Sequence, residues 1–218
     1  MGNFKYHSDG EVPKNGEIFV FGSNLAGVHG AGAAKEAMEN FGATYGLGLG
    51  IQGQSYAIPT KDCNIHTMSL NIIELCINQF IEYAKNSKKV FWVTRVGCGL
   101  AGYSDGDIAP MFKNAPENCI MPKPWKQHLE EHVLRNELKT ALSSNVVRVG
   151  FTKVNGDIRV INCTLDSSRI DSEYDVLYNK NARKINDKVL AVWCVDLKEW
   201  RSFKIENVIN YEVIYDSN

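Results

Sequence analysis

Four short apolar runs, each bounded by turn-forming residues, divide the first 125 residues of the chain. Their length and their content of β-branched and aromatic residues are typical of buried strands. The third run, KKVFWVTRVG, is the strongest candidate for a central strand. Pro59 lies in the second run and restricts it to a sheet edge or a strand end, because proline cannot donate a ladder hydrogen bond. Strands are therefore predicted at residues 17–23, 55–61, 88–97 and 118–122.

Helical periodicity alternates with these strands. Residues 69–87 carry the clearest pattern, because Ile73, Ile77 and Ile81 recur on one face and Ser69 precedes the first turn as a capping residue. Gly42 is a C-cap signal for an earlier helix. The alternation predicts an α/β layered domain with a largely parallel or mixed sheet. Further helices are predicted at residues 33–42 and 104–112, and a glycine-rich loop at residues 45–54.

The pattern changes beyond residue 125. Residues 126–144 predict an amphipathic helix, and five short stretches of alternating or apolar residues follow it. The first two of these stretches flank Asn155-Gly156, which is a signal for a hairpin turn. Residues 166–187 are polar and predict a long loop. The predicted organisation is an N-terminal domain over residues 1–125, a linker helix over 126–144 and a small β-barrel over 145–218.

Composition and charge narrow the range of functions. The 218 residues carry a formal net charge of −1, and neither half is basic. This balance argues against a broad nucleic-acid surface, although an average can conceal a local patch. No apolar stretch approaches the roughly 20 residues of a membrane span, so no membrane partner is expected. The first 16 residues lack the apolar core of a signal peptide, and we expect a cytoplasmic protein.

Two glycine-rich loops follow predicted strands and are the candidate binding elements. FGSNLAGVHGAGAAK follows the first strand, and VGCGLAGY follows the central strand. In open α/β sheets, ligands sit beyond the carboxyl ends of the strands, and a helix start offers free N–H groups to a phosphate. Tyr103 can cover a ribose or a base. Two such loops on neighbouring strand ends suit a diphosphate between two sugars, and the alternative is that their glycines serve tight turns.

These motifs resemble those of the macrodomain family over residues 17–122, closest to the subgroup that includes terminal ADP-ribose protein glycohydrolases. HGAGAAKEAMENFG, YAIPTK and RVGCGLAGY follow one another in the order and spacing of that subgroup. The resemblance implies a three-layer α/β/α fold that binds ADP-ribose, with the first loop at the distal ribose and the second around the diphosphate. It implies ligand contacts at Gly22, Ser23, Asn24, His29, Gly30, Ala31, Gly32, Ala33, Thr60, Gly97, Cys98, Gly99, Leu100, Ala101, Gly102 and Tyr103.

The resemblance is less complete for catalysis. Lys61 matches the lysine of the hydrolytic subgroup, which can attack the anomeric carbon of ribose with help from a carboxylate. That subgroup carries an aspartate directly after Gly-Cys-Gly-Leu, where this chain has Ala101. Asp105 is the candidate substitute, and Asp107 is a second. Binding is therefore favoured over hydrolysis, and removal of ADP-ribose from a modified macromolecule and capture of a cyclic ADP-ribose signal remain alternatives.

The C-terminal region resembles, more faintly, the small SH3-like β-barrel proteins of large tailed phages. The resemblance rests on VVRVGFTKVNGDIRVINCTL and VWCVDLKEWRSFKIENV. It implies a phage origin and, with it, action in the host cytoplasm on NAD-derived signals or ADP-ribosyl marks. The main hypothesis is an ADP-ribose-binding domain fused to an accessory barrel, with no cofactor and no metal site. The rival is a scaffold whose barrel docks a partner.

Overall fold

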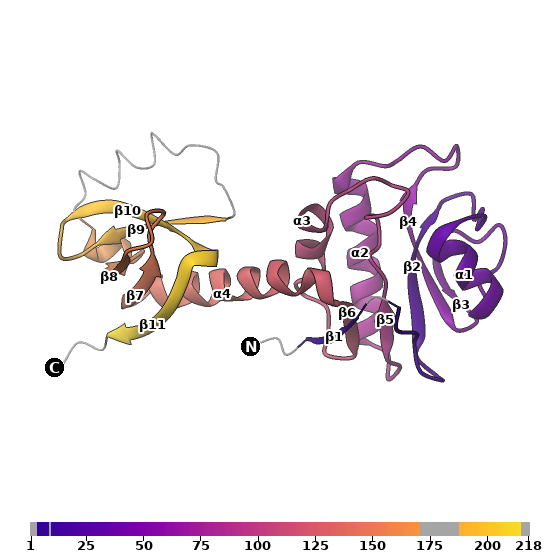
Figure 1. Cartoon of the computed structure of the whole chain (residues 1–218), viewed down its shortest axis with the longest axis horizontal. Coiled ribbons are helices and arrows are strands. Elements are labelled where there is room, and N and C mark those ends of the chain that lie inside the picture. Colours follow the sequence, from indigo (N-terminus) through magenta and orange to yellow (C-terminus); the bar gives the residue numbers. More distant parts are fainter. Residues whose placement is uncertain (1–3, 9, 171–187, 215–218) are drawn as a thin grey trace. The chain divides into compact units, whose positions relative to one another are not determined.

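The computed structural model describes residues 4–8, 10–170 and 188–214 of the chain. It divides into two compact units, residues 1–130 and 131–218. The boundary falls inside the long helix α4 (Lys126–Leu142), close to the predicted change of pattern (Figure 1). Each unit has a sheet and an apolar core of its own.

The N-terminal unit is built on a six-stranded, mostly parallel sheet with the order β1-β6-β5-β2-β4-β3. Every neighbouring pair is parallel except β3 and β4, which are antiparallel. The carboxyl ends of β2, β4 and β5 therefore meet at one edge of the sheet. The strands are β1 (Lys5–His7), β2 (Ile18–Asn24), β3 (Gly50–Gln52), β4 (Ser55–Lys61), β5 (Phe91–Val93) and β6 (Cys119–Pro122).

Helices cover both faces of this sheet, because buried side chains alternate along β2. Ile18 and Val20 pack with α2 (Leu70–Lys85) in one core, whereas Phe19 and Phe21 pack with α1 (Gly32–Asn40) in another. Figure 1 shows the two helices on opposite sides of β2 and β4. The three-layer α/β/α arrangement is thus confirmed. The short elements α3 (Asp105–Ile108), η1 (Ala109–Phe112) and η2 (Lys123–Trp125) complete the unit.

The four predicted strands are confirmed, and two further strands are present. β1 was not predicted, and β3 lies inside residues 45–54, where a loop was predicted. β3 forms because the first half of β4 offers it an antiparallel partner, from Ser55 to Ala57. Pro59 lies beyond that pairing and opposite Ser23 of β2, so one side of β4 is an edge there, as the sequence indicated.

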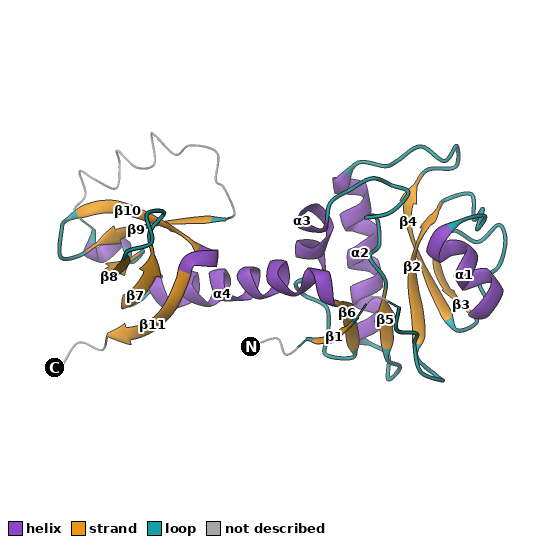
Figure 2. Cartoon of the chain, in the orientation of Figure 1, coloured by secondary structure: helices purple, strands orange, loops and turns teal. Residues whose placement is uncertain are grey.

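The C-terminal unit is a five-stranded antiparallel sheet with the order β10-β9-β8-β7-β11. Figure 2 shows that strands dominate this unit. The predicted hairpin is confirmed, with Gly156 at φ 91° in its turn. The strands are β7 (Val146–Thr152), β8 (Ile158–Thr164), β9 (Val189–Cys194), β10 (Glu199–Lys204) and β11 (Val208–Ile214), with the short η3 (Ser167–Arg169) and η4 (Ile205–Asn207) between them.

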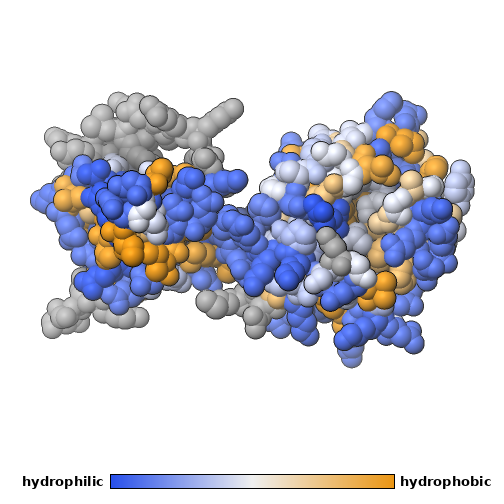
Figure 3. Space-filling model, in the orientation of Figure 1, coloured by the Kyte–Doolittle hydropathy of each residue, from blue (hydrophilic) through white to orange (hydrophobic). Residues whose placement is uncertain are grey.

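The second half of α4 completes this core. Leu138 and Leu142 are fully buried against Val147, Val149 and other side chains of the sheet. Most of the predicted loop at residues 166–187 lies outside the described residues. In the part of the chain that is described, no helix is both long and apolar enough to cross a membrane. Figure 3 shows hydrophilic side chains over much of the visible face, with separate hydrophobic patches on each unit.

Candidate ligand-binding site

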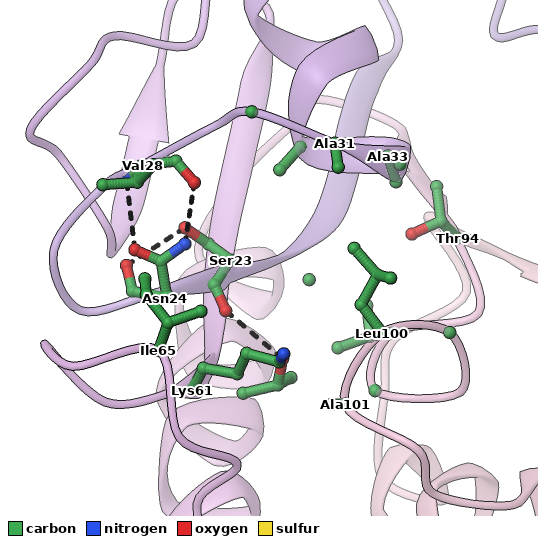
Figure 4. Close-up of a pocket in the computed structure, with 18 of the residues that line it drawn as sticks. Ser23, Asn24, Val28, Ala31, Ala33, Lys61, Ile65, Thr94, Leu100 and Ala101 are labelled. Atoms are coloured by element: carbon green, nitrogen blue, oxygen red, sulfur yellow. Dashed lines mark hydrogen bonds between the residues drawn. The ribbon is translucent and has the colours of Figure 1, made fainter.

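A cleft of about 340 Å³ opens at the carboxyl ends of β2, β4 and β5 in the N-terminal unit. It lies between the loop after β2, the start of α1 and the loop after β5, as the topology predicts (Figure 4). The two glycine-rich loops are therefore opposite walls of one cavity. Its volume falls within the range of small-molecule sites, at the lower end.

The side chain of Asn24 holds the first wall in place by two hydrogen bonds to the backbone of Val28 in the same loop. Asn24 Nδ2 donates to the carbonyl oxygen of Val28 at 2.8 Å, and the Val28 amide donates to Asn24 Oδ1 at 3.0 Å. Gly27 lies inside this turn with φ 67°, and a Cβ there would lie 2.3 Å from the backbone nitrogen of Leu47. These contacts fix the shape of the loop.

The start of α1 supplies the donors of this wall. Ala31 is the N-cap residue, its methyl side chain makes no capping hydrogen bond, and the first turn contains no acidic residue. The first N–H groups of a helix lack intrahelical acceptors, and the helix dipole favours a negative charge beside them. Gly30, Ala31 and Gly32 line the cleft. The wall can therefore accept a phosphate without a basic side chain of its own.

The second wall is held from outside the cleft. Tyr103 Oη donates to the carbonyl oxygen of Met68 at 2.6 Å, and Thr67 Oγ1 donates to that of Ala101 at 3.2 Å. Gly97 has φ 77°, and its α-carbon packs so closely on Ile108 that a Cβ would lie 3.1 Å from it. Gly97, Gly99, Leu100 and Ala101 face the cavity. Tyr103 thus fixes the loop, and it does not line the cleft.

Lys61, the last residue of β4, is one of the two basic residues in the described lining. Figure 4 shows its side chain running from β4 toward the space between Ser23 and Leu100. Within the described residues, no carboxylate lies within ion-pair distance of its amino group, whereas Arg95, the other basic residue of the lining, is paired with Asp105. The described lining contains no aspartate or glutamate. The cleft therefore favours an anion.

His29 does not line the cleft, although the sequence suggested a ligand contact there. It is 1% exposed, shares a hydrogen bond of 3.1 Å between its Nε2 and Ser23 Oγ, and meets the ring of Phe21 edge-on. Its Nδ1 is buried with no hydrogen-bond partner among the described residues. Burial lowers the pKa of His29 from the usual 6.5. His29 therefore holds Ser23 from the interior side of the loop, as a neutral imidazole.

We expect the free energy of unfolding of the N-terminal unit to decrease at acidic pH. Because the pKa of His29 is lower in the folded state, the unfolded chain binds the proton first as pH falls through 6.5, so stability decreases below that pH. Urea unfolding of the N-terminal unit between pH 7.5 and 5 should therefore show a pH slope that His29→Gln reduces. The matched control is His66→Gln, which alters an exposed histidine. An unchanged slope in His29→Gln would contradict the assignment.

Asp105 is held outside the cleft lining. Both its carboxylate oxygens accept from Arg95, at 2.9 and 2.6 Å, and Oδ1 also accepts from Nε1 of the fully buried Trp125 at 2.7 Å. The hydrogen bonds from Arg95 hold the pKa of Asp105 below its usual value. This geometry speaks against the catalytic role considered for Asp105. Asp107 is also committed elsewhere, since it forms a capping box with Ser104 at the start of α3.

Cys98 also points away from the cavity. Its thiol packs against the main core, and burial and the charge of Asp105 raise its pKa to about 12. A thiol in this state is neither a nucleophile nor an anion ligand. Five expected site residues therefore lie outside the lining: His29, Cys98, Gly102, Tyr103 and Asp105.

The other expected residues do meet at the cleft. They come from three separate parts of the chain, and the fold brings their backbones together around one cavity. The lining contains Gly22, Ser23, Asn24, Gly30, Ala31, Gly32, Ala33, Thr60, Lys61, Gly97, Gly99, Leu100 and Ala101. Six further lining residues were not predicted: Val28, Ala34, Ile65, Thr94, Arg95 and Val96. Thr94 and Arg95 directly follow β5, and that position was the one available signal for them.

Comparison with known proteins identifies the C-terminal unit. Residues 135–209 match the family described as "WYL_2, Sm-like SH3 beta-barrel fold". Through these residues, the chain belongs to the WYL_2 family. A curated relative from Enterobacteria phage T4, "Uncharacterized 11.5 kDa protein in Gp31-cd intergenic region", is 32% identical over 77 residues, which are 35% of this chain and 76% of that protein. No solved structure matches the chain.

The WYL_2 match lies entirely within the C-terminal unit and includes no residue of the N-terminal unit. The match begins within α4 and ends within β11, so it covers β7 to β10 completely. The expected SH3-like barrel and the likeness to a phage protein are thus confirmed. No macrodomain is among the matches, so the macrodomain resemblance of the N-terminal unit stays a prediction from its sequence motifs.

Proposed function

We propose that the N-terminal unit binds ADP-ribose or a closely related NAD-derived nucleotide in the cleft. The observation that carries the proposal is the composition of the lining. A helix start and two glycine-rich loops present backbone N–H groups, Lys61 adds a positive charge, and the described lining contains no carboxylate. Backbone donors and one cation suit a diphosphate, and the glycines and alanines of the two loops leave room for the attached sugars.

Binding is the favoured activity, ahead of hydrolysis. Cleavage of a glycosidic or ester bond at ribose needs a group that donates or accepts a proton, usually a carboxylate. Ala101 stands where the hydrolytic subgroup has its aspartate, and Asp105 is engaged by Arg95 and Trp125. We therefore propose capture of a nucleotide signal or of an ADP-ribosyl mark in the cytoplasm. Removal of ADP-ribose from a modified target is the second candidate, which Lys61 alone supports.

Calorimetric titration with ADP-ribose, NAD and cyclic ADP-ribose tests the proposal. Gly99 faces the cleft, has no atom within 4 Å of the Cβ it would gain, and does not need a positive φ. Gly99→Val should therefore fold normally, occupy the phosphate path and weaken ADP-ribose binding at least about tenfold, or about 1.4 kcal/mol. Gly106→Ala, which also adds a side chain where only ordinary contacts arise, lies outside the lining and should leave affinity unchanged.

The outcomes separate the alternatives. Tight binding of cyclic ADP-ribose with weak binding of ADP-ribose would reassign the ligand to the cyclic signal. If no nucleotide binds, or if Gly99→Val binds as well as the unaltered protein, the cleft is not the nucleotide site.

A further inference from the structure

Two cysteines face each other across the sheet of the C-terminal unit. Cys163 of β8 and Cys194 of β9 are paired in register, and both are free thiols. They are 0% and 1% exposed and belong to the same apolar core, so their side chains lie on one face of the sheet. The fold therefore brings together two thiols that are far apart in the sequence.

The backbone hydrogen bonds show which kind of pair this is. The amide of Val195 donates to the carbonyl oxygen of Asn162 at 2.9 Å, and these two residues flank the cysteines. A bond between the flanking residues of an antiparallel ladder marks a non-hydrogen-bonded pair, in which the α-carbons are about 4.5 Å apart and the side chains are closest. A disulfide spans α-carbons about 4.4 to 6.8 Å apart. The register therefore satisfies the backbone requirement for a disulfide.

The cysteine pair also lies at the shortest ladder of this sheet. The β7–β8 and β9–β10 ladders each extend over six residue pairs, as does β7–β11 across its irregularity. Among the described residues, β8 and β9 pair only at Cys163–Cys194 and at Thr164–Trp193. This short ladder connects β7, β8 and β11 to β9 and β10. A covalent bond at one of its two positions would hold these two parts of the sheet together.

We propose that Cys163 and Cys194 form a reversible disulfide under oxidising conditions, and that this bond joins the two parts of the C-terminal sheet. The oxidant is a low-molecular-weight disulfide such as oxidised glutathione. One cysteine attacks it as a thiolate and releases one thiol, and the other cysteine then attacks the mixed disulfide and releases the second thiol. Two protein thiols are thereby oxidised, one small disulfide is reduced, and the two protons end on the released thiols.

Burial sets the conditions for this reaction. Burial raises the pKa of Cys163 to about 12, and the neighbouring Cys194 raises it further, whereas the thiolate is the reactive form. The Cys163 thiol also donates to the carbonyl oxygen of Val147 at 3.5 Å, a weak bond that the disulfide would replace. The folded sheet therefore protects Cys163, and the reaction requires β9 to separate from β8. The short ladder makes this opening less costly than opening of the longer ladders.

The test refolds the full chain from urea in oxidised and reduced glutathione, so that burial does not limit the reaction. Free thiols are then blocked with N-ethylmaleimide, and peptide mapping by mass spectrometry should find Cys163 joined to Cys194. The exposed Cys63 should take up glutathione, which shows that the oxidant has acted. The disulfide closes a loop of about 30 residues, so amide hydrogen exchange in β8 and β9 should slow at least about tenfold. Dithiothreitol should restore the original rate.

Cys163→Ala and Cys194→Ala are the matched variants, and each should abolish the slowing by oxidant. Cys119→Ala is the control and should retain it, since Cys119 is a fully buried cysteine of the N-terminal unit. Each protein is compared with its own reduced form, so destabilisation by the substitution does not affect the comparison. If a variant does not fold, reversal by dithiothreitol in the unaltered protein decides the test.

Two results would overturn the proposal. In the first, Cys63 takes up glutathione while Cys163 and Cys194 remain unjoined. In the second, the two cysteines are joined, but β8 and β9 exchange as fast as in the reduced protein. Both results are independent of nucleotide binding in the cleft of the N-terminal unit.

Discussion

Replacing Asp105 with alanine should lower the free energy of unfolding of the N-terminal unit by about 2 kcal/mol, the usual cost of leaving a buried polar group unsatisfied. The group is the indole N–H of Trp125, which is fully buried and donates to Asp105 Oδ1 at 2.7 Å. The ion pair with Arg95 adds less, because the Arg95 side chain is 44% exposed and its charge is screened by water. Hydrogen exchange reports the two units separately and is the measurement of choice.

Asp105→Asn separates this structural role from a catalytic one. The amide oxygen of asparagine can still accept from Trp125, so most of the stability should return, whereas a catalytic carboxylate would be lost. Glu117→Ala is the control for removal of a negative charge, since Glu117 is exposed on the same unit. If Asp105→Ala unfolds no more readily than Glu117→Ala, the contact with Trp125 contributes nothing. If Asp105→Asn folds normally but abolishes a turnover seen in the unaltered protein, Asp105 is catalytic after all.

The strands that the sequence predicts are those whose own residues require burial. The run IFVF of β2 has apolar side chains on both faces and cannot be solvent-exposed, and the same holds for FWV of β5. β3 is different, because the stretch around Gly50 has no strand pattern and pairs only where β4 offers an edge. Its partner is the next strand, joined to it by the turn Gly53–Gln54, but three residues are too few for local periodicity to carry a signal.

The same distinction applies to the cleft. The glycine-rich loops were predictable, because a strand end, small residues and a helix start are all local features. The direction of each side chain was not. His29 and Cys98 stand in those loops, yet both turn toward the interior, His29 against Phe21 and Cys98 into the main core. Which face of an irregular loop is inward is decided by the elements that it covers, and these lie elsewhere in the sequence.

Lys61→Ala should weaken ADP-ribose binding by about ten- to a hundredfold, equivalent to about 1.4–2.8 kcal/mol. Lys61 is the lining cation with no carboxylate within ion-pair distance among the described residues. A charge-assisted hydrogen bond from it to the diphosphate would be among the stronger contacts available in the cleft. Titration calorimetry measures the loss. Lys35→Ala is the matched control, because Lys35 is a cation on α1 that is 54% exposed and does not line the cleft.

Lys61→Arg distinguishes the two roles that a lysine can have here. Arginine keeps the positive charge but stays protonated and cannot attack the anomeric carbon, which requires a neutral amine. A binding protein should therefore keep much of its affinity in Lys61→Arg, and neither it nor the unaltered protein should release ADP-ribose from a modified protein. Release by the unaltered protein that is lost in both variants would instead make Lys61 the nucleophile. If Lys61→Ala matches the unaltered protein in affinity and in turnover, the residue has neither role, and the resemblance to the hydrolytic subgroup does not extend to this position.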